Sequence, residues 1–285
     1  MRVAIIGANG QLGSDLVQVL SGWDVHPLTR PECDVRDSTT IQGALRGIRP
    51  TVVINTAALT DVDACENDVR QAFDVNACAV QTVAEASAAL GAVLVQVSTD
   101  YVFDGAKGAP YQEDDAAHPL NVYGISKLAG EYVAQSACFH HFVVRTSGLY
   151  GAAGSRGKGG NFVETVIRIA REGRPIRVVN DQVLAPTYTR DVAQAIRRLI
   201  STEAYGVYHV TNSGACSWYE FAGRIFKRLD LAPELTAITS AEWGARARRP
   251  PYSVLATEKL ADAGGGELRV WTEALDDYLM QKGYL

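Results

Sequence analysis

The first twenty residues constrain the fold more than any other stretch of the chain. A short β-branched run, Arg2 to Ile6, leads into glycines at positions 7, 10 and 13, and an amphipathic segment follows over 14–20. A strand, a glycine-rich turn and a helix form the phosphate-binding start of a dinucleotide fold, where the diphosphate binds unpaired N–H groups and the positive helix dipole. The predicted dinucleotide contacts are Gly7, Asn9, Gly10, Gln11 and Leu12.

Strand-like and helical segments alternate through the first half of the chain. The strands predicted at 51–55 and 92–97 are almost wholly apolar, which is typical of a sheet buried on both faces. We therefore expect an α/β fold, a Rossmann-type doubly wound parallel sheet over 1–150 that is extended by parts of 180–215. A smaller mixed α/β domain that binds substrate is expected over most of 151–285.

Composition excludes several classes of function. The formal net charge is −5 and no long Lys/Arg run occurs, which argues against a nucleic acid polymer as partner. The five cysteines are scattered without a C-x-x-C, and the five histidines lack metal-ligand spacing, so we expect reduced thiols in the cytoplasm and no metal site. No apolar run approaches the roughly 20 residues that a membrane span needs, and the first strand follows Met1 directly, so neither a membrane anchor nor a signal peptide is expected.

The end of the second predicted strand, 24–28, bears on the choice of cofactor. An NAD-specific site would carry an acid there for the ribose 2′-hydroxyl, whereas this chain has Thr29 and Arg30. An arginine attracts a 2′-phosphate, so the sequence favours NADPH, with NADH as the alternative; a solvated loop is the other interpretation of Arg30. Further predicted cofactor contacts, at the adenine edge and along the sheet, are Asp34, Val35, Ala57 and Ala58.

A tyrosine and a lysine lie one helical turn apart in the segment 121–131. In a helix, Tyr123 and Lys127 leave the same face with their Cβ atoms about 6 Å apart. A cation beside a phenol favours the phenolate, so we expect the pKa of Tyr123 to fall from its usual value of about 10. Such a tyrosine suits a general acid for reduction of a carbonyl. An ordinary helix with an exposed lysine and a half-buried tyrosine is the alternative, because the spacing is common.

Other polar segments have two interpretations each. Asn76, within a helix expected over 69–90, either holds backbone or water near the site or serves local packing. The arginines of 246–249 form either an anion clamp or a solvated loop, and 151–160 is expected to be a glycine-rich, basic loop. The helix that carries Tyr123 is expected to pack Leu128 and Tyr132 inward.

Taken together, the motifs resemble the extended short-chain dehydrogenase/reductase superfamily, and within it the dTDP-4-dehydrorhamnose reductase family. The resemblance spans nearly the whole chain. Besides the three glycines, it is carried by Asn55-Thr56-Ala57-Ala58, Ser98-Thr99-Asp100-Tyr101-Val102-Phe103, Tyr123-Gly124, Lys127-Leu128-Ala129-Gly130-Glu131, Arg145-Thr146-Ser147, Asn180-Asp181-Gln182, Ala185-Pro186-Thr187, Gly206-Val207-Tyr208-His209 and Arg248-Arg249-Pro250.

The resemblance implies a reaction and its residues. NADPH would reduce the C4 ketone of dTDP-4-dehydro-β-L-rhamnose to give dTDP-L-rhamnose. Tyr123 would protonate the ketone oxygen, Lys127 would hold the nicotinamide ribose, and Thr99 would orient the substrate oxygen. The substrate contacts implied are Thr99, Asp100, Tyr101, Phe103, Tyr123, Arg248 and Arg249.

Departures from the family pattern keep alternatives open. Gly148 stands where members often carry a tryptophan, which leaves the sugar undetermined. Tyr101 stands where nucleotide-sugar dehydratases carry a glutamate, which favours reduction over dehydration. Some members form magnesium-bridged dimers; Asp15 suits such a bridge but Arg190 does not, so we expect no metal and a possible homodimer. The alternative functions are a nucleotide-sugar epimerase or dehydratase, and a cofactor-binding regulatory subunit like the β subunit of methionine adenosyltransferase.

Overall fold

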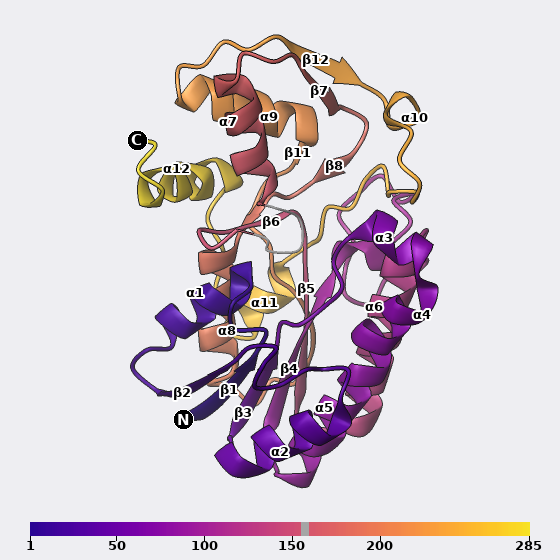
Figure 1. The fold of residues 1–285 in the computed structure, drawn as a ribbon, viewed down its shortest axis with the longest axis vertical. Helices are drawn as coiled ribbons and strands as arrows, with labels where there is room; N and C mark the ends of the chain where they lie inside the picture. Colours follow the sequence, from indigo (N-terminus) through magenta and orange to yellow (C-terminus); the bar gives the residue numbers. More distant parts are fainter. Residues whose placement is uncertain (155–159) are drawn as a thin grey trace.

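The computed structural model describes residues 1–154 and 160–285, and it consists of two lobes (Figure 1). The lower lobe in this view is a parallel sheet with helices on both faces, and the upper lobe is a smaller mixed assembly. Residues 155–159, half of the loop predicted over 151–160, lie outside the described residues.

The sheet has six parallel strands in the order β10-β5-β4-β3-β1-β2. Their bounds are β1 (Arg2–Ile6), β2 (Asp24–Leu28), β3 (Val52–Asn55), β4 (Val93–Thr99), β5 (His141–Thr146) and β10 (Gly206–His209). The predicted doubly wound α/β fold is confirmed. Strand β10 comes from late in the chain, within the range 180–215.

Alternating side chains of the strands build a core on each face of the sheet. Val3 and Ile5 pack with α1 (Gln11–Val19) and α8 (Thr189–Leu199), near which lies the short α11 (Glu258–Asp262). Ala4 and Ile6 face the opposite side, which is covered by α2 (Ser38–Ile48), α5 (Ala79–Ala89) and α6 (Val122–Ala137). Within the described part of the chain, no helix has both the length and the apolar character to cross a membrane.

The chain reverses its direction of winding at β1. Strand β2 lies on one side of β1, and β3 lies on the other. In such sheets ligands bind in the crevice outside the carboxyl ends of the two strands at the reversal. Here those ends are Gly7 and the segment 56–58, so the topology places the predicted cofactor residues at this crevice.

The upper lobe has a core of its own, in which aromatic side chains such as Tyr150, Tyr188, Phe221 and Tyr278 pack among aliphatic ones. Its helices are α7 (Phe162–Arg171), α9 (Trp218–Arg228), α10 (Ser240–Trp243) and α12 (Trp271–Gln281). Its strands form three pairs, which are β6 (Leu149–Tyr150) with β9 (Thr187–Tyr188), β7 (Ile176–Val179) with β12 (Leu235–Ile238), and β8 (Val183–Leu184) with β11 (Cys216–Ser217). A separate core favours the predicted division near residue 150.

Two expectations about helices were wrong. The segment expected as one helix over 69–90 is α4 (Val69–Phe73), a π-helical turn (Asp74–Cys78) and α5, and it follows α3 (Val62–Asn67). Tyr132 does not pack inward: its side chain is 61% exposed. The buried positions of α6 include 126, 127, 130, 131 and 134, so the helical period turns position 132 toward solvent.

Replacing Gly13 by alanine tests the close packing of α1 on the turn. A Cβ at this position would lie 2.3 Å from the carbonyl oxygen of Gly7 and 2.8 Å from the Cα of Ala8. We expect Gly13→Ala to destabilise the fold by about 2 kcal/mol and to weaken NADP binding at least about tenfold, as measured by denaturant unfolding and fluorescence titration.

Gly43→Ala is the matched control. A Cβ at Gly43, inside α2, has no atom within 4 Å, so the substitution should stabilise the helix by up to about 1 kcal/mol and leave NADP binding unchanged. Equal effects of the two substitutions would contradict the packing described here.

Candidate active site

The glycine turn makes a cradle at the crevice. Gly7 has a φ of +79°, and a Cβ there would lie 2.8 Å from Thr56 Oγ1 and 2.9 Å from the amide nitrogen of Ala57. Gly10 is the N-cap of α1 and has no side chain to cover the N–H groups at the start of the helix. Leu12 is buried in the core, so only its backbone is available to a ligand. The cradle therefore fits a dinucleotide diphosphate.

A cluster of charges follows β2. Arg36 binds the Asp34 carboxylate with two bonds, Nη2–Oδ2 at 2.6 Å and Nε–Oδ1 at 3.0 Å, and Arg30 Nε lies 3.3 Å from Oδ2. The hydrogen bonds from Arg36 hold the pKa of Asp34 well below its usual range. The side chain of Arg30 is 67% exposed, so its guanidinium is accessible to a phosphate from solvent.

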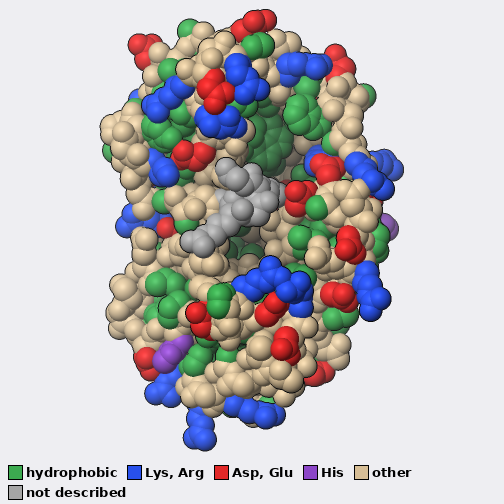
Figure 2. Space-filling model, in the orientation of Figure 1, with side chains coloured by type: hydrophobic (Ala, Val, Ile, Leu, Met, Phe, Trp, Pro, Cys, Tyr) green, Lys and Arg blue, Asp and Glu red, His purple; other side chains and the backbone are tan. Residues whose placement is uncertain are grey.

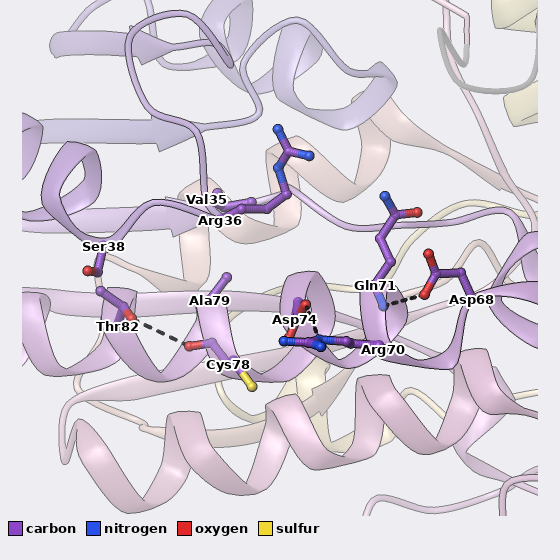
Figure 3. A pocket seen from close by; sticks show the side chains of 10 residues that line it. All are labelled: Val35, Arg36, Ser38, Asp68, Arg70, Gln71, Asp74, Cys78, Ala79 and Thr82. Atoms are coloured by element: carbon purple, nitrogen blue, oxygen red, sulfur yellow. Dashed lines mark hydrogen bonds and ion pairs between the residues drawn. The ribbon is translucent and has the colours of Figure 1, made fainter.

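A pocket of about 450 Å³ opens beside this cluster (Figure 3). Val35 and Arg36 line one side of it, and residues of α4, the π-helical turn and α5 line the other, among them Gln71 and Thr82. None of the predicted catalytic residues lines it. The pocket lies next to Val35, which the sequence predicts as a contact at the adenine edge of the cofactor.

Helix α6 begins at the carboxyl edge of β4 because three groups hold it there. The Asn121 side chain accepts a hydrogen bond from the Gly124 amide at 2.8 Å, and Glu66 accepts one from the Val122 amide at 2.8 Å. A Cβ at Gly124 would lie 2.2 Å from the carbonyl oxygen of Tyr101, so only glycine permits this approach. The approach brings Tyr123 beside Thr99 and Tyr101.

The pKa of the Tyr123 phenol is raised in this structure, so the phenol is protonated at neutral pH. Burial raises the pKa of its phenol, the neighbouring Thr99 hydroxyl lowers it, and the Asp100 charge raises it; the net direction is upward. The ring of Tyr101 packs edge-on against that of Tyr123, with centroids 5.9 Å apart. The expectation that Lys127 lowers this pKa was therefore wrong, because burial and the Asp100 charge both raise it and only the Thr99 hydroxyl opposes them.

Lys127 is buried and bonded to the backbone. Its Nζ donates a hydrogen bond to the Val97 carbonyl oxygen at 2.7 Å. Burial lowers the pKa of Lys127 to about 8, and the neighbouring Glu131 charge partly opposes this. A lysine whose pKa lies this close to neutral pH exchanges a proton more readily than an exposed lysine does.

Asn76 has the positional role that the sequence left open. Its Oδ1 accepts from the Leu59 amide at 2.9 Å, and its Nδ2 donates to the Leu59 carbonyl at 3.1 Å and to Ser126 Oγ at 3.0 Å. A Cβ at Gly130 would lie 2.2 Å from the Asn76 carbonyl oxygen. Asn76 thus ties the loop after β3 to the helix that carries Tyr123.

Sequence reasoning gave no role to a buried ion pair behind the site. Arg145 on β5 and Glu131 on α6 pair at 2.7 Å, and Ser98 Oγ donates to Glu131 at 2.5 Å. His209 Nδ1 lies 3.1 Å from the Ala256 carbonyl, and burial lowers the pKa of His209 to about 3, so its ring is neutral. In the sequence, Arg145 and Glu131 appear only as members of two motifs of the resemblance. Nothing in the sequence indicates that these two side chains form an ion pair.

The predicted substrate residues divide into two groups. Thr99, Tyr101 and Tyr123 lie together at the strand end. Phe103 is fully buried and stacks on Tyr111 at 4.2 Å between ring centroids, and Asp100 is 3% exposed with its carboxylate bonded inside the protein. This geometry favours structural roles for Phe103 and Asp100 over the predicted contacts with a sugar.

The two arginines of the predicted anion clamp differ in their surroundings. Arg249 pairs with Asp63 on α3 at 2.7 Å, so its charge is already matched. Arg248 is exposed, and its carbonyl oxygen accepts a hydrogen bond from Asn121 at 2.7 Å, which ties this segment to the start of α6. On the face shown in Figure 2, the upper half of the molecule is hollowed, and hydrophobic side chains line the hollow.

The region considered for magnesium holds an internal contact instead. Thr189 donates a hydrogen bond to Asp15, and burial raises the pKa of this carboxyl. Across 1–154 and 160–285, no group of three or more His, Cys, Asp or Glu side chains is placed to hold a metal ion.

Comparisons with known proteins agree with this geometry. A family model described as the RmlD substrate binding domain matches residues 1–283. The chain is 39% identical over 283 residues to the spore coat polysaccharide biosynthesis protein SpsK of Bacillus subtilis (strain 168), covering 99% of this chain and 98% of that protein. It is 37% identical over 289 residues to the dTDP-4-dehydrorhamnose reductase of Sinorhizobium fredii, covering 96% of this chain and 95% of that one.

Solved structures also show similarity to dTDP-4-dehydrorhamnose reductases. The dTDP-4-dehydrorhamnose reductase of Bacillus anthracis str. Ames in complex with NADP matches with a TM-score of 0.94 and 40% identity, over 98% of this chain and 99% of that one. The fold alone is shared with the UDP-glucose 4-epimerase of Thermus thermophilus, at 22% identity, a TM-score of 0.80, and coverage of 97% of this chain and 99% of that one.

The buried ammonium of Lys127 predicts a pH-dependent stability. Its folded-state pKa of about 8 lies below the ordinary 10.5, so between these values the unfolded chain binds more protons than the folded one. As pH rises through this window, the free energy of unfolding of the ligand-free parent should increase by up to about 3 kcal/mol relative to that of Lys127→Met.

Urea unfolding at pH 7 and pH 9.5 measures this difference. Lys227→Met, which replaces an exposed lysine on α9, is the control. A difference between the parent and Lys127→Met that stays constant with pH would contradict the burial of the charge.

Proposed function

The chain belongs to the dTDP-4-dehydrorhamnose reductase family, and from this premise we propose that it reduces the C4 ketone of dTDP-4-dehydro-β-L-rhamnose to dTDP-L-rhamnose with NADPH. The observation that carries the proposal is the phenol of Tyr123, which lies beside Thr99 and Tyr101 at the carboxyl edge of a sheet whose glycine cradle fits a dinucleotide. A proton donor beside such a cradle suits reduction of a carbonyl.

The residues of the cradle and of the strand ends would hold the cofactor. Backbone N–H groups at the start of α1 would bind its diphosphate, the small residues 57 and 58 would leave room along the sheet, and Arg30 would bind the 2′-phosphate. When bound, NADPH supplies the hydride for C4 of the sugar.

The protein supplies the proton and the geometry. Tyr123 donates its proton to the ketone oxygen as negative charge develops there, and the Thr99 hydroxyl beside it orients the phenol. The raised pKa of Tyr123 suits this role because the phenol is protonated at neutral pH. Lys127, whose pKa is about 8, holds the ribose of the cofactor and stabilises the tyrosinate that the transfer leaves.

The nucleotide end of the substrate would meet the segment 246–249. Arg248 is exposed there and would pair with the diphosphate, while Tyr101 would contact the sugar beside Tyr123. A cytoplasmic location and assembly as a homodimer complete the proposal.

Tyr123→Phe tests the assigned proton donor. The variant should lose at least about 100-fold in kcat, because the general acid is removed, and should bind NADPH as the parent does. The value of kcat is measured by following NADPH oxidation at 340 nm with a panel of nucleotide-linked 4-keto sugars. NADPH binding is measured by fluorescence titration.

The same assay separates the alternative functions. Net NADPH oxidation by the parent with a dTDP-linked keto sugar supports the reductase. An epimerase or a dehydratase would convert the sugar without net oxidation, and a regulatory subunit would bind the cofactor without turnover. A Tyr123→Phe variant that turns over at the parental rate would show that another group donates the proton.

Arg30→Ala tests cofactor selection. Loss of an exposed cation facing the 2′-phosphate should raise the KM for NADPH by about tenfold, and it should change the KM for NADH less than about twofold. The control is Arg46→Ala, which removes an exposed arginine of α2 and should change neither KM value. If Arg30→Ala raises the KM values for NADPH and NADH equally, Arg30 does not bind the 2′-phosphate.

A further inference from the structure

The carboxylate of Asp100 accepts hydrogen bonds from hydroxyl groups of three separate segments. Asp100 follows β4 directly and begins a 3₁₀ turn (Asp100–Val102). Thr99 Oγ1 donates to its Oδ1 at 3.0 Å, while Ser147 Oγ at 2.7 Å and Ser253 Oγ at 2.5 Å donate to its Oδ2. The carboxylate therefore binds the end of β4, the end of β5 and a distant C-terminal segment at one point.

The C-terminal segment connects this point to the upper lobe. The Ser253 amide donates to the Val183 carbonyl oxygen of β8 at 2.9 Å. A few residues earlier the same segment carries Arg248, which we propose as the contact for the substrate diphosphate, and its carbonyl is bonded to Asn121 at the start of α6. Asp100 thus lies between the proton donor and the segment that would hold the nucleotide.

This carboxyl is costly to bury, which argues that its position matters. Burial raises its pKa, and the hydroxyls of Ser253, Ser147 and Thr99 oppose that change only in part. A buried carboxylate needs hydrogen bonds or a cation to offset its desolvation, and here the side chains that bond to it are neutral hydroxyls. An apolar side chain would fill the same space without this cost, but it would hold none of the three hydroxyls.

The bond to Asp100 also determines how Thr99 meets Tyr123. The Thr99 hydroxyl donates to the carboxylate, and its oxygen accepts from the Tyr101 amide at 3.2 Å. Its torsion is therefore held from two sides, in a position beside the Tyr123 phenol, whose pKa the hydroxyl lowers. A carboxylate that fixes a hydroxyl in this way acts on the reaction through that hydroxyl.

We propose that Asp100 is a positioning residue for the reduction: its carboxylate fixes the Thr99 hydroxyl beside Tyr123 and, through Ser253, fastens the nucleotide-binding segment of the upper lobe to the strand ends of the cofactor lobe. The inference rests on the proposed function for its kinetic part. The fastening of the segment can be measured without any activity.

Asp100→Asn keeps the size of the side chain and removes its charge. We expect kcat to fall at least about tenfold while the NADPH dissociation constant stays within about twofold, because the cradle is untouched. Since the Asp100 charge raises the pKa of Tyr123, the alkaline limb of the kcat–pH profile should move to lower pH in this variant. A residue that only supports the fold would lower thermal stability without moving that limb.

Two further variants keep the test decisive. Ser253→Ala retains the carboxylate and removes the link to the upper lobe; it should raise the KM for the sugar nucleotide several-fold and speed amide hydrogen exchange over 251–255 at least about tenfold. Ser87→Ala removes a buried hydroxyl on α5 that bonds only locally, to the Val83 carbonyl, and it should change neither kcat nor the pH profile.

Each result decides the inference. If Asp100→Asn keeps the parental kcat and pH profile while Tyr123→Phe is inactive, Asp100 is not a positioning residue although the proposed function stands. If Asp100→Asn fails to fold, Ser253→Ala carries the test, and parental exchange and KM in that variant overturn the inference. If the parent oxidises no NADPH with any of the sugars, the proposed function fails, and exchange over 251–255 still decides whether the carboxylate fastens the segment.

Discussion

The close approach of helix α6 to the end of strand β4 is the constraint on which the site depends. A Cβ at Gly124 would lie 2.2 Å from the carbonyl oxygen of Tyr101, a distance that no side chain tolerates. One turn later in the helix, Lys127 reaches the Val97 carbonyl at 2.7 Å. Since both Tyr123 and Lys127 leave the inner face of α6, the position of one backbone relative to another determines where the proton donor lies.

Burial controls the charges of the site more than pairing does. It raises the pKa of Tyr123 and lowers that of Lys127, so the site favours a protonated phenol over a tyrosinate–ammonium pair. A protonated phenol is the state required of the donor in a reduction. Behind it the Glu131–Arg145 pair and the Asp100 hydroxyl cluster are buried, and they hold the ends of β4 and β5 in register with α6.

Local patterns in the sequence predicted the parallel sheet. The bounds expected for the strands at 2–6 and 24–28 are those of β1 and β2, because hydrophobic period and turn residues are local signals. Periodicity did not predict the interruption at Asp74–Cys78, nor which face of α6 is buried and hence that Tyr132 is exposed, since both depend on how α6 packs against its neighbours. Likewise, nothing local joins Ser253 to Asp100, or sets the sign of the pKa shift at Tyr123, because burial is a property of the assembled fold.

A crystal structure of the protein with NADP and dTDP-L-rhamnose tests the central claim most directly. The account predicts that Tyr123 Oη lies within about 3.2 Å of the O4 atom of the sugar, with Thr99 Oγ1 at a similar distance and the nicotinamide ring over the glycine side of the crevice. A complex in which another side chain occupies that position, with the Tyr123 hydroxyl directed away from the sugar, would contradict it.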